Sequence, residues 1–73
     1  MKDRDTGQIT VNGEPHDWQD RSMTELLKDF DVAPDKPGVA VALNSDVLPR
    51  GDWQSVRVKP GDRIEIVHIV RGG

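Results

Sequence analysis

The sequence predicts an α+β domain in which a mixed β-sheet packs on one main helix. Three observations support this prediction. A hairpin signal lies near the start, one capped amphipathic segment follows it, and the remainder holds an apolar run and a second alternating run. The helix supplies the crossover that allows the first and last strands to lie side by side and parallel. The expected order is strand, strand, helix, strand, short strand, strand.

The first predicted element is a hairpin over residues 8–18. Residues 8–11 alternate between polar and apolar side chains, which is the period of a half-buried strand. Asn12-Gly13 is a strong turn signal because both residue types tolerate a positive φ. The second strand returns over residues 14–18, and Pro15 marks it as an edge strand because proline cannot donate to the ladder.

The second predicted element is a helix from about residue 23 to residue 30. Ser22 and Glu25 have the spacing of a capping box, in which each side chain accepts from the other residue's backbone. Val32 is expected to contact the core just beyond the helix. An apolar stripe follows the cap at positions i, i+3, i+4 and i+7, formed by Met23, Leu26, Leu27 and Phe30.

The remaining predicted elements are strands. Residues 39–43 form a continuous apolar run, which is typical of a central strand. A short strand is expected around residues 47–48, and the last strand covers residues 63–70 after a Pro-Gly turn at 60–61. Within the apolar run, we expect the larger side chains to face the helix and the alanines to face away: Val39, Val41 and Leu43 against Ala40 and Ala42.

Length and composition favour a carrier or binding module over an enzyme. A chain of 73 residues forms one small core and has little room for a buried catalytic cleft as well. The net charge of −3 disfavours a nucleic-acid binder. Because there is neither an apolar run long enough to span a membrane nor a signal peptide, we expect no membrane association and a cytoplasmic location.

Metal and thiol chemistry are also disfavoured. The chain has no cysteine, which excludes disulfides, thiolate nucleophiles and cysteine metal sites. Its two histidines, His16 and His68, are far apart in the sequence and lack a clear third ligand, so we expect no metal site. If the protein carries sulfur, the sulfur cannot sit on a side-chain thiol and must sit on the terminal carboxyl group.

The sequence ends in Gly72-Gly73, which we predict to be the functional end. Two glycines present a carboxylate on a tether without side chains, so it can enter a narrow active site on another protein. We divide the chain into a flexible arm at 1–7, a domain at 8–70 and a flexible tail at 71–73. Gly73 is the expected reacting group, with Arg71 and Gly72 threading into the partner. A frayed terminus is the alternative.

One ordered set of features runs along the chain: Asn12-Gly13, the capped helix with Leu26-Leu27, the strand 39–44, Val47-Leu48-Pro49-Arg50 with Trp53, the segment 60–67, and Gly72-Gly73. This set resembles the ThiS family of sulfur carrier proteins, and the resemblance covers residues 8–73. Two features depart from the family. Residues 1–7 are extra, and Asn44-Ser45 stands where the family more often has Asn-Gly.

The resemblance implies a ubiquitin-like β-grasp fold and a sulfur carrier, not an enzyme, in the synthesis of the thiazole of thiamine. It implies that an adenylating enzyme of the ThiF type, related to ubiquitin-activating enzymes, uses ATP and Mg²⁺ to activate Gly73. A cysteine persulfide on a sulfur donor then displaces AMP, and the resulting thiocarboxylate donates sulfur to a thiazole synthase of the ThiG type. No cofactor is expected on this chain itself.

Three alternatives stay open at this point. A ubiquitin-like modifier uses the same activation but ends in an isopeptide bond to a lysine. A carrier for molybdopterin or another acceptor differs only in the final recipient. A passive β-grasp interaction module has a tail without function.

Strand alternation predicts a docking surface on the face of the sheet opposite the helix. If Ile64 and Ile66 point into the core, the intervening residues of the last strand point outward, together with the two alanines of the central strand. The expected docking residues are Ala40, Ala42, Glu65, Val67 and Ile69.

Overall fold

The computed structural model describes residues 7–69. Most of the expected arm, and the tail with Arg71, Gly72 and Gly73, lie outside the described residues. The elements, in chain order, are β1 (Gln8–Val11), β2 (Glu14–Asp17), α1 (Met23–Lys28), β3 (Val39–Leu43), β4 (Asp46–Val47), the 3₁₀ turn η2 (Arg50–Asp52) and β5 (Arg63–His68).

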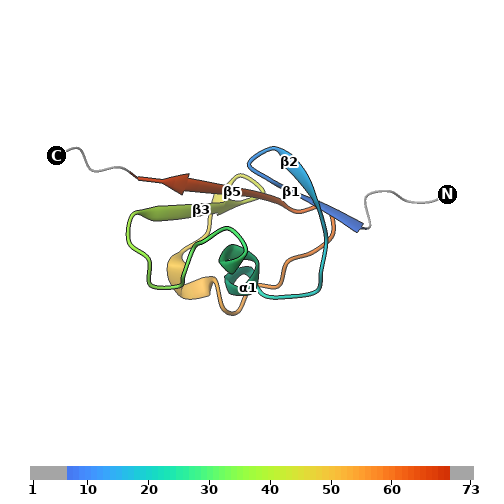
Figure 1. The fold of residues 1–73 in the computed structure, drawn as a ribbon. Helices are drawn as coiled ribbons and strands as arrows, with labels where there is room; N and C mark the ends of the chain where they lie inside the picture. The colour runs from blue at the N-terminus through green and yellow to red at the C-terminus, as the bar shows by residue number, and fades with distance from the viewer. Residues whose placement is uncertain (1–6, 70–73) are drawn as a thin grey trace.

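The five strands form one mixed sheet in the order β2-β1-β5-β3-β4, and α1 lies against one face of it (Figure 1). The first and last strands, β1 and β5, are parallel neighbours, whereas the other pairs are antiparallel. This arrangement confirms the predicted α+β class, and it is the β-grasp arrangement that the resemblance implies.

The β1–β2 hairpin forms as predicted, with φ angles of 52° at Asn12 and 84° at Gly13. β2 is an edge strand and contains Pro15. It ends at Asp17, one residue earlier than expected. Trp18 instead packs against the core and donates its indole N–H to the Val58 carbonyl at 2.9 Å. The indole thereby closes one end of the core.

The helix begins at the predicted capping box. Ser22 Oγ accepts from the Glu25 N–H at 3.2 Å, and Glu25 Oε1 accepts from the Ser22 N–H at 3.1 Å. α1 ends at Lys28 rather than residue 30, because the chain closes with a left-handed residue, Asp31, at φ 64°. The following Val32 N–H bonds back to the Leu27 carbonyl at 3.0 Å, which is a Schellman ending.

The core fills the space between α1 and the inner face of the sheet, and Val32 belongs to it as predicted. Of the three larger β3 residues, Val39 and Val41 are buried and Leu43 is half-buried against the core. The full buried cluster is Ile9, Val11, Met23, Leu26, Leu27, Val32, Val39, Val41, Trp53, Val58, Ile64 and Ile66.

Two strand boundaries differ from the predictions. The short strand β4 covers Asp46–Val47, one residue earlier than expected. β5 ends at His68, whereas the prediction continued to residue 70. His68 is paired with Val39, the first residue of β3, and beyond this pair the Ile69 N–H still donates to the Gly38 carbonyl at 2.7 Å. Val70 lies outside the described part of the chain.

The β3–β4 turn uses two left-handed residues other than glycine. Asn44 has φ 52° and Ser45 has φ 77°. The Asn44 side chain donates to Asp62 Oδ1 at 3.1 Å and accepts from the Arg63 N–H at 2.8 Å. The tight turn is therefore kept where the family more often has Asn-Gly, with Ser45 in a conformation that favours glycine.

Ser45→Gly is expected to raise the free energy of unfolding by about 0.5–1 kcal/mol, because relief of the left-handed strain outweighs the loss of the exposed hydrogen bond from Arg63 to Ser45 Oγ. Urea unfolding followed by circular dichroism measures this change. Asn44→Gly in the same turn is the matched control. It should lower the stability, since it removes both hydrogen bonds of the Asn44 side chain. Equal gains from both variants would contradict this explanation.

Candidate functional site

β5 carries the candidate site because it runs through the middle of the sheet and leads toward the C-terminus (Figure 1). Ile64 is 0% and Ile66 7% exposed, so both face the core. The intervening Glu65 is exposed, Val67 is 54% exposed and Ile69 is 53% exposed. The predicted facing of this strand is confirmed.

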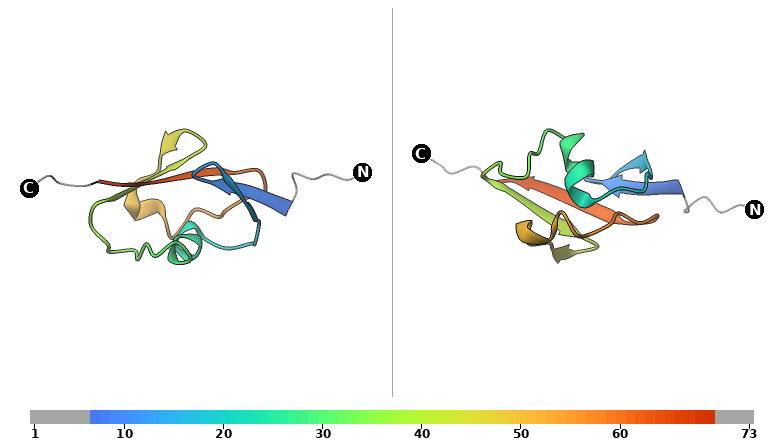
Figure 2. Two further views of the ribbon diagram at one scale, coloured as in Figure 1. Left: turned by 45° about the horizontal axis from the view of Figure 1, so that its top comes forward. Right: turned by 90° about the horizontal axis from the view of Figure 1, so that it is seen from below.

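The neighbouring β3 adds its small residues to the same face. Ala40 pairs with Val67 and Ala42 with Glu65, and directly paired residues of an antiparallel ladder share a face. Both alanines are half-buried. Their short side chains project less from the sheet than the neighbouring β5 side chains do, so the surface is shallow there. The helix α1 lies on the opposite face of the sheet, and the left view of Figure 2 shows it below the strands.

Val47 is a member of this face that sequence reasoning missed. It is paired with Ala42 and is 79% exposed, more than the other exposed large apolar side chains of the described chain. A two-residue turn at Asn44-Ser45 sets the register that pairs residues 42 and 47. This turn is therefore the sequence feature from which the facing of Val47 could have been predicted. We call Ala40, Ala42, Val47, Val67 and Ile69 the outer apolar patch.

Two charged residues of β5 border the outer apolar patch. Arg63, at the start of β5, donates to Ser45 Oγ at 2.8 Å, and Glu65 lies between the apolar residues of the same strand. An exposed apolar patch with a charged rim is typical of a protein–protein contact surface.

Two ion pairs within residues 7–69 link the loop between β2 and α1 to neighbouring segments. Arg21 contacts Asp29 at 2.8 Å, and Arg57 contacts Asp20 at 2.7 Å. The hydrogen bond and negative charge of Asp20 raise the pKa of Arg57. Exposed pairs of this kind contribute little to stability.

Arg50 holds the segment that precedes β3. Its guanidinium donates to the Pro34 carbonyl at 2.6 Å and to the Val39 carbonyl at 3.3 Å, and it stacks on the Trp53 ring at 4.6 Å. The side chain thus fixes the start of β3, the strand that supplies the alanines of the outer apolar patch.

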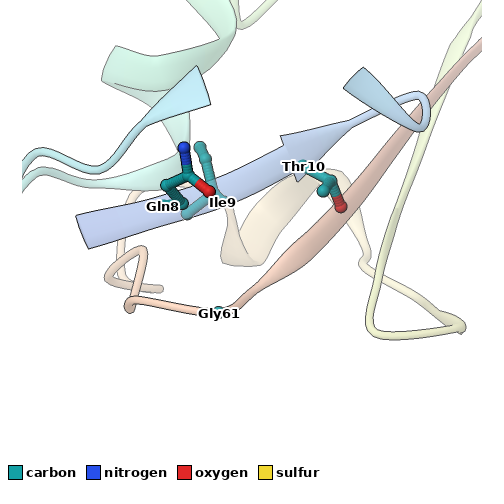
Figure 3. Close-up of a pocket in the computed structure, with 4 residues that line it drawn as sticks. All are labelled: Gln8, Ile9, Thr10 and Gly61. Carbon is teal, nitrogen blue, oxygen red and sulfur yellow. The ribbon is translucent and has the colours of Figure 1, made fainter. Parts of the chain in front are cut away.

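A surface hollow of about 210 Å³ lies at the other end of the sheet, where β1 begins (Figure 3). Gln8, Ile9, Thr10 and Gly61 line it. These four residues supply no carboxylate, imidazole or ammonium group for acid–base chemistry. Gly61 precedes β5, whereas Ile69 follows it, so the hollow and the exit of β5 are at opposite ends of that strand.

The two histidines occupy separate places. His16 packs edge-on against Phe30 with ring centroids 5.3 Å apart, and His68 ends β5. Within residues 7–69, no three His, Cys, Asp or Glu side chains gather as metal ligands.

Within residues 7–69, no helix is long and apolar enough to cross a membrane.

Comparison with known proteins places this fold in a family. A model of the ThiS family matches residues 8–73, which include every strand and the terminal glycines. The chain belongs to the ThiS family. A crystal structure of the thiamine biosynthesis protein ThiS from Geobacter metallireducens superposes with a TM-score of 0.74 at 36% identity. It covers 90% of this chain and 99% of that one. The ThiS β-grasp fold is thereby confirmed.

Curated relatives of this ThiS-family chain include sulfur carriers and thiazole synthases. The sulfur carrier protein ThiS of Escherichia coli is 32% identical over 53 residues, covering 73% of this chain and 77% of that protein. A thiazole synthase of Magnetococcus marinus is 41% identical over 66 residues, covering 89% of this chain but 20% of that protein. The ThiS-family chain thus spans about a fifth of the length of that synthase.

Proposed function

We propose that this chain is a sulfur carrier of thiamine biosynthesis, a co-substrate whose Gly73 carboxyl group becomes a thiocarboxylate. The observation that carries the proposal is the family match, which spans residues 8–73, from β1 to Gly73. The architecture supports it, because β5 is anchored in the core by Ile64 and Ile66 and is followed by the residues that end in the two glycines.

The chemistry begins with a poor electrophile. A carboxylate is negatively charged and has no good leaving group. One carboxylate oxygen of Gly73 attacks the α-phosphorus of Mg²⁺-bound ATP in an adenylating enzyme of the ThiF type. Pyrophosphate leaves, and Gly73 becomes an acyl adenylate. Electron withdrawal by the phosphate then makes the acyl carbon open to attack.

Sulfur enters in the second step. The terminal sulfur of a cysteine persulfide on a donor protein attacks the acyl carbon, and AMP leaves with the bonding electron pair. The product is an acyl disulfide. A second thiol reduces its S–S bond, releasing the Gly73 thiocarboxylate and a disulfide. The donor cysteine must come from a partner because this chain has none.

The tail suits a narrow channel. Gly72 and Gly73 have no Cβ, so their backbone passes where side chains would clash. Residues 70–73 reach about 13 Å beyond Ile69 if extended, at roughly 3.3 Å per residue. In this proposal the Arg71 guanidinium meets an acidic groove at the channel entrance.

The outer apolar patch and Glu65 form the docking surface in this proposal. Exposed apolar area around the two alanines of β3 comes from Val47, Val67 and Ile69. The surface serves the adenylating enzyme first and a thiazole synthase of the ThiG type afterwards. A matching segment within the Magnetococcus marinus thiazole synthase supports the second partner. In this proposal the transfer of sulfur takes place in the cytoplasm.

The test is ATP–pyrophosphate exchange with the ThiF-type enzyme of the same organism. We expect exchange with the full chain and its loss by at least about a hundredfold when Gly73 is deleted, because the activated carboxyl is then misplaced. Removing residues 1–6, which precede the family match, is the control and should leave exchange unchanged. Absence of exchange with the intact chain would contradict the proposal.

A further inference from the structure

β5 extends beyond its neighbour β1. The parallel ladder joins only Thr10 to Arg63 and Val11 to Ile64, whereas β3 pairs with residues 64–68 (Figure 2). We infer that the uncovered edge at residues 66–68 is a strand-pairing site for an extended segment of the adenylating enzyme. This inference rests on the proposed function, because the edge leads directly into the tail.

The paired part of the ladder shows which backbone groups face β1. The Thr10 N–H donates to the Asp62 carbonyl at 3.0 Å, and the Asn12 N–H donates to the Ile64 carbonyl at 2.9 Å. Backbone groups of alternate strand residues point to the same side. The even-numbered residues of β5 therefore direct their N–H and C=O groups toward the β1 side.

The Asn12 side chain ends this ladder. Its Oδ1 accepts from the Ile66 N–H at 2.8 Å, in the place where the carbonyl of a longer β1 would sit. The next groups on that side are the Ile66 carbonyl and the His68 N–H, and within residues 7–69 neither has a backbone partner. Odd-numbered groups bond toward β3, as the Ile69 N–H does to the Gly38 carbonyl at 2.7 Å.

The two free groups match the pairing pattern of one added residue. In a parallel ladder, a residue opposite position 67 donates to the carbonyl of residue 66 and accepts from the N–H of residue 68. Such main-chain bonds recognise any extended peptide, with side-chain contacts providing selectivity. The exposed side chains of Val67 and His68 flank this position.

Continuity with the tail identifies the occupant. His68 is five residues before Gly73, so a strand paired at His68 fixes the direction in which the tail leaves the domain. The exposed faces of Val67 and Ile69 belong to the outer apolar patch next to the same edge. An enzyme that docks on this patch has its backbone within reach of the edge while it holds the tail.

The test compares His68→Pro with His68→Ala. Proline removes the N–H and is tolerated at an unpaired strand edge, whereas alanine keeps the N–H. In pyrophosphate exchange, we expect His68→Pro to raise the KM for the carrier about tenfold, as loss of a hydrogen bond predicts. His68→Ala loses only the imidazole and keeps the N–H, so its KM should stay well below that of His68→Pro. Equal KM values for both variants, with normal exchange by the wild type, would overturn the inference and leave the proposed function intact.

Amide hydrogen exchange in the wild-type protein decides the matter even if His68→Pro does not fold. In the free carrier, we expect fast exchange at the His68 N–H and slow exchange at the Ile69 N–H, which is bonded to Gly38. Adding the adenylating enzyme with ATP should slow exchange at His68 at least about tenfold. Unchanged exchange at His68 in a saturated complex would also overturn the inference.

Discussion

Val67→Asp is expected to weaken binding to the adenylating enzyme by about thirtyfold or more without unfolding the domain. In the free protein this side chain is 54% exposed, so a carboxylate there remains hydrated. Docking of the outer apolar patch would bury that carboxylate without a partner, at a cost of about 2 kcal/mol or more. The KM for the carrier in pyrophosphate exchange, together with the Tm, measures both effects.

The control for Val67→Asp is the same new charge elsewhere. Gln54 is exposed and belongs to the segment after η2, outside the patch, so Gln54→Asp should change neither the KM nor the Tm. Loss of folding in Val67→Asp would mean that the strand faces the other way. A normal KM in a folded Val67→Asp protein would remove the docking role from this face.

Ile64→Ala is expected to lower the free energy of unfolding by about 2–5 kcal/mol. Ile64 is 0% exposed and lies in the central strand, where its removal leaves a cavity against the helix. A domain of this size has only a few kcal/mol of net stability, so much of the protein should be unfolded at room temperature. Urea titration followed by tryptophan fluorescence measures the loss.

Ile69→Ala is the matched control because it removes the same atoms from a side chain that is 53% exposed. Its effect on the free energy of unfolding should stay below about 1 kcal/mol, since little packing is lost. Similar losses of unfolding free energy for Ile64→Ala and Ile69→Ala would contradict the assignment of these residues to the inner and outer faces of the sheet.

The local elements could be predicted because their signals are local. Asn12-Gly13 determined the hairpin, and Ser22 with Glu25 determined the start of the helix. The end of the helix was wrong by two residues, because it depends on Asp31 adopting a left-handed conformation that no glycine announces. Alternation along β5 was enough to predict which side chains face the core.

Contacts between distant segments could not be predicted in the same way. The bond from the Ile66 N–H to Asn12 Oδ1 joins residues 54 apart in the sequence, and it requires the exact register of two parallel strands. Val47 was missed because its face follows from the pairing of β4 with β3. The chemistry at Gly73 was inferred from the resemblance, and it stays a prediction.

Mass spectrometry of the chain isolated from cells tests the central claim most directly. We predict a fraction of molecules in which one oxygen of the Gly73 carboxyl group is replaced by sulfur, located by fragmentation to the last residue. This fraction should disappear when the adenylating enzyme is absent. A Gly73 found only as a free carboxylate, or only as branched peptides joined to lysine, in cells that make thiamine would contradict the sulfur-carrier account.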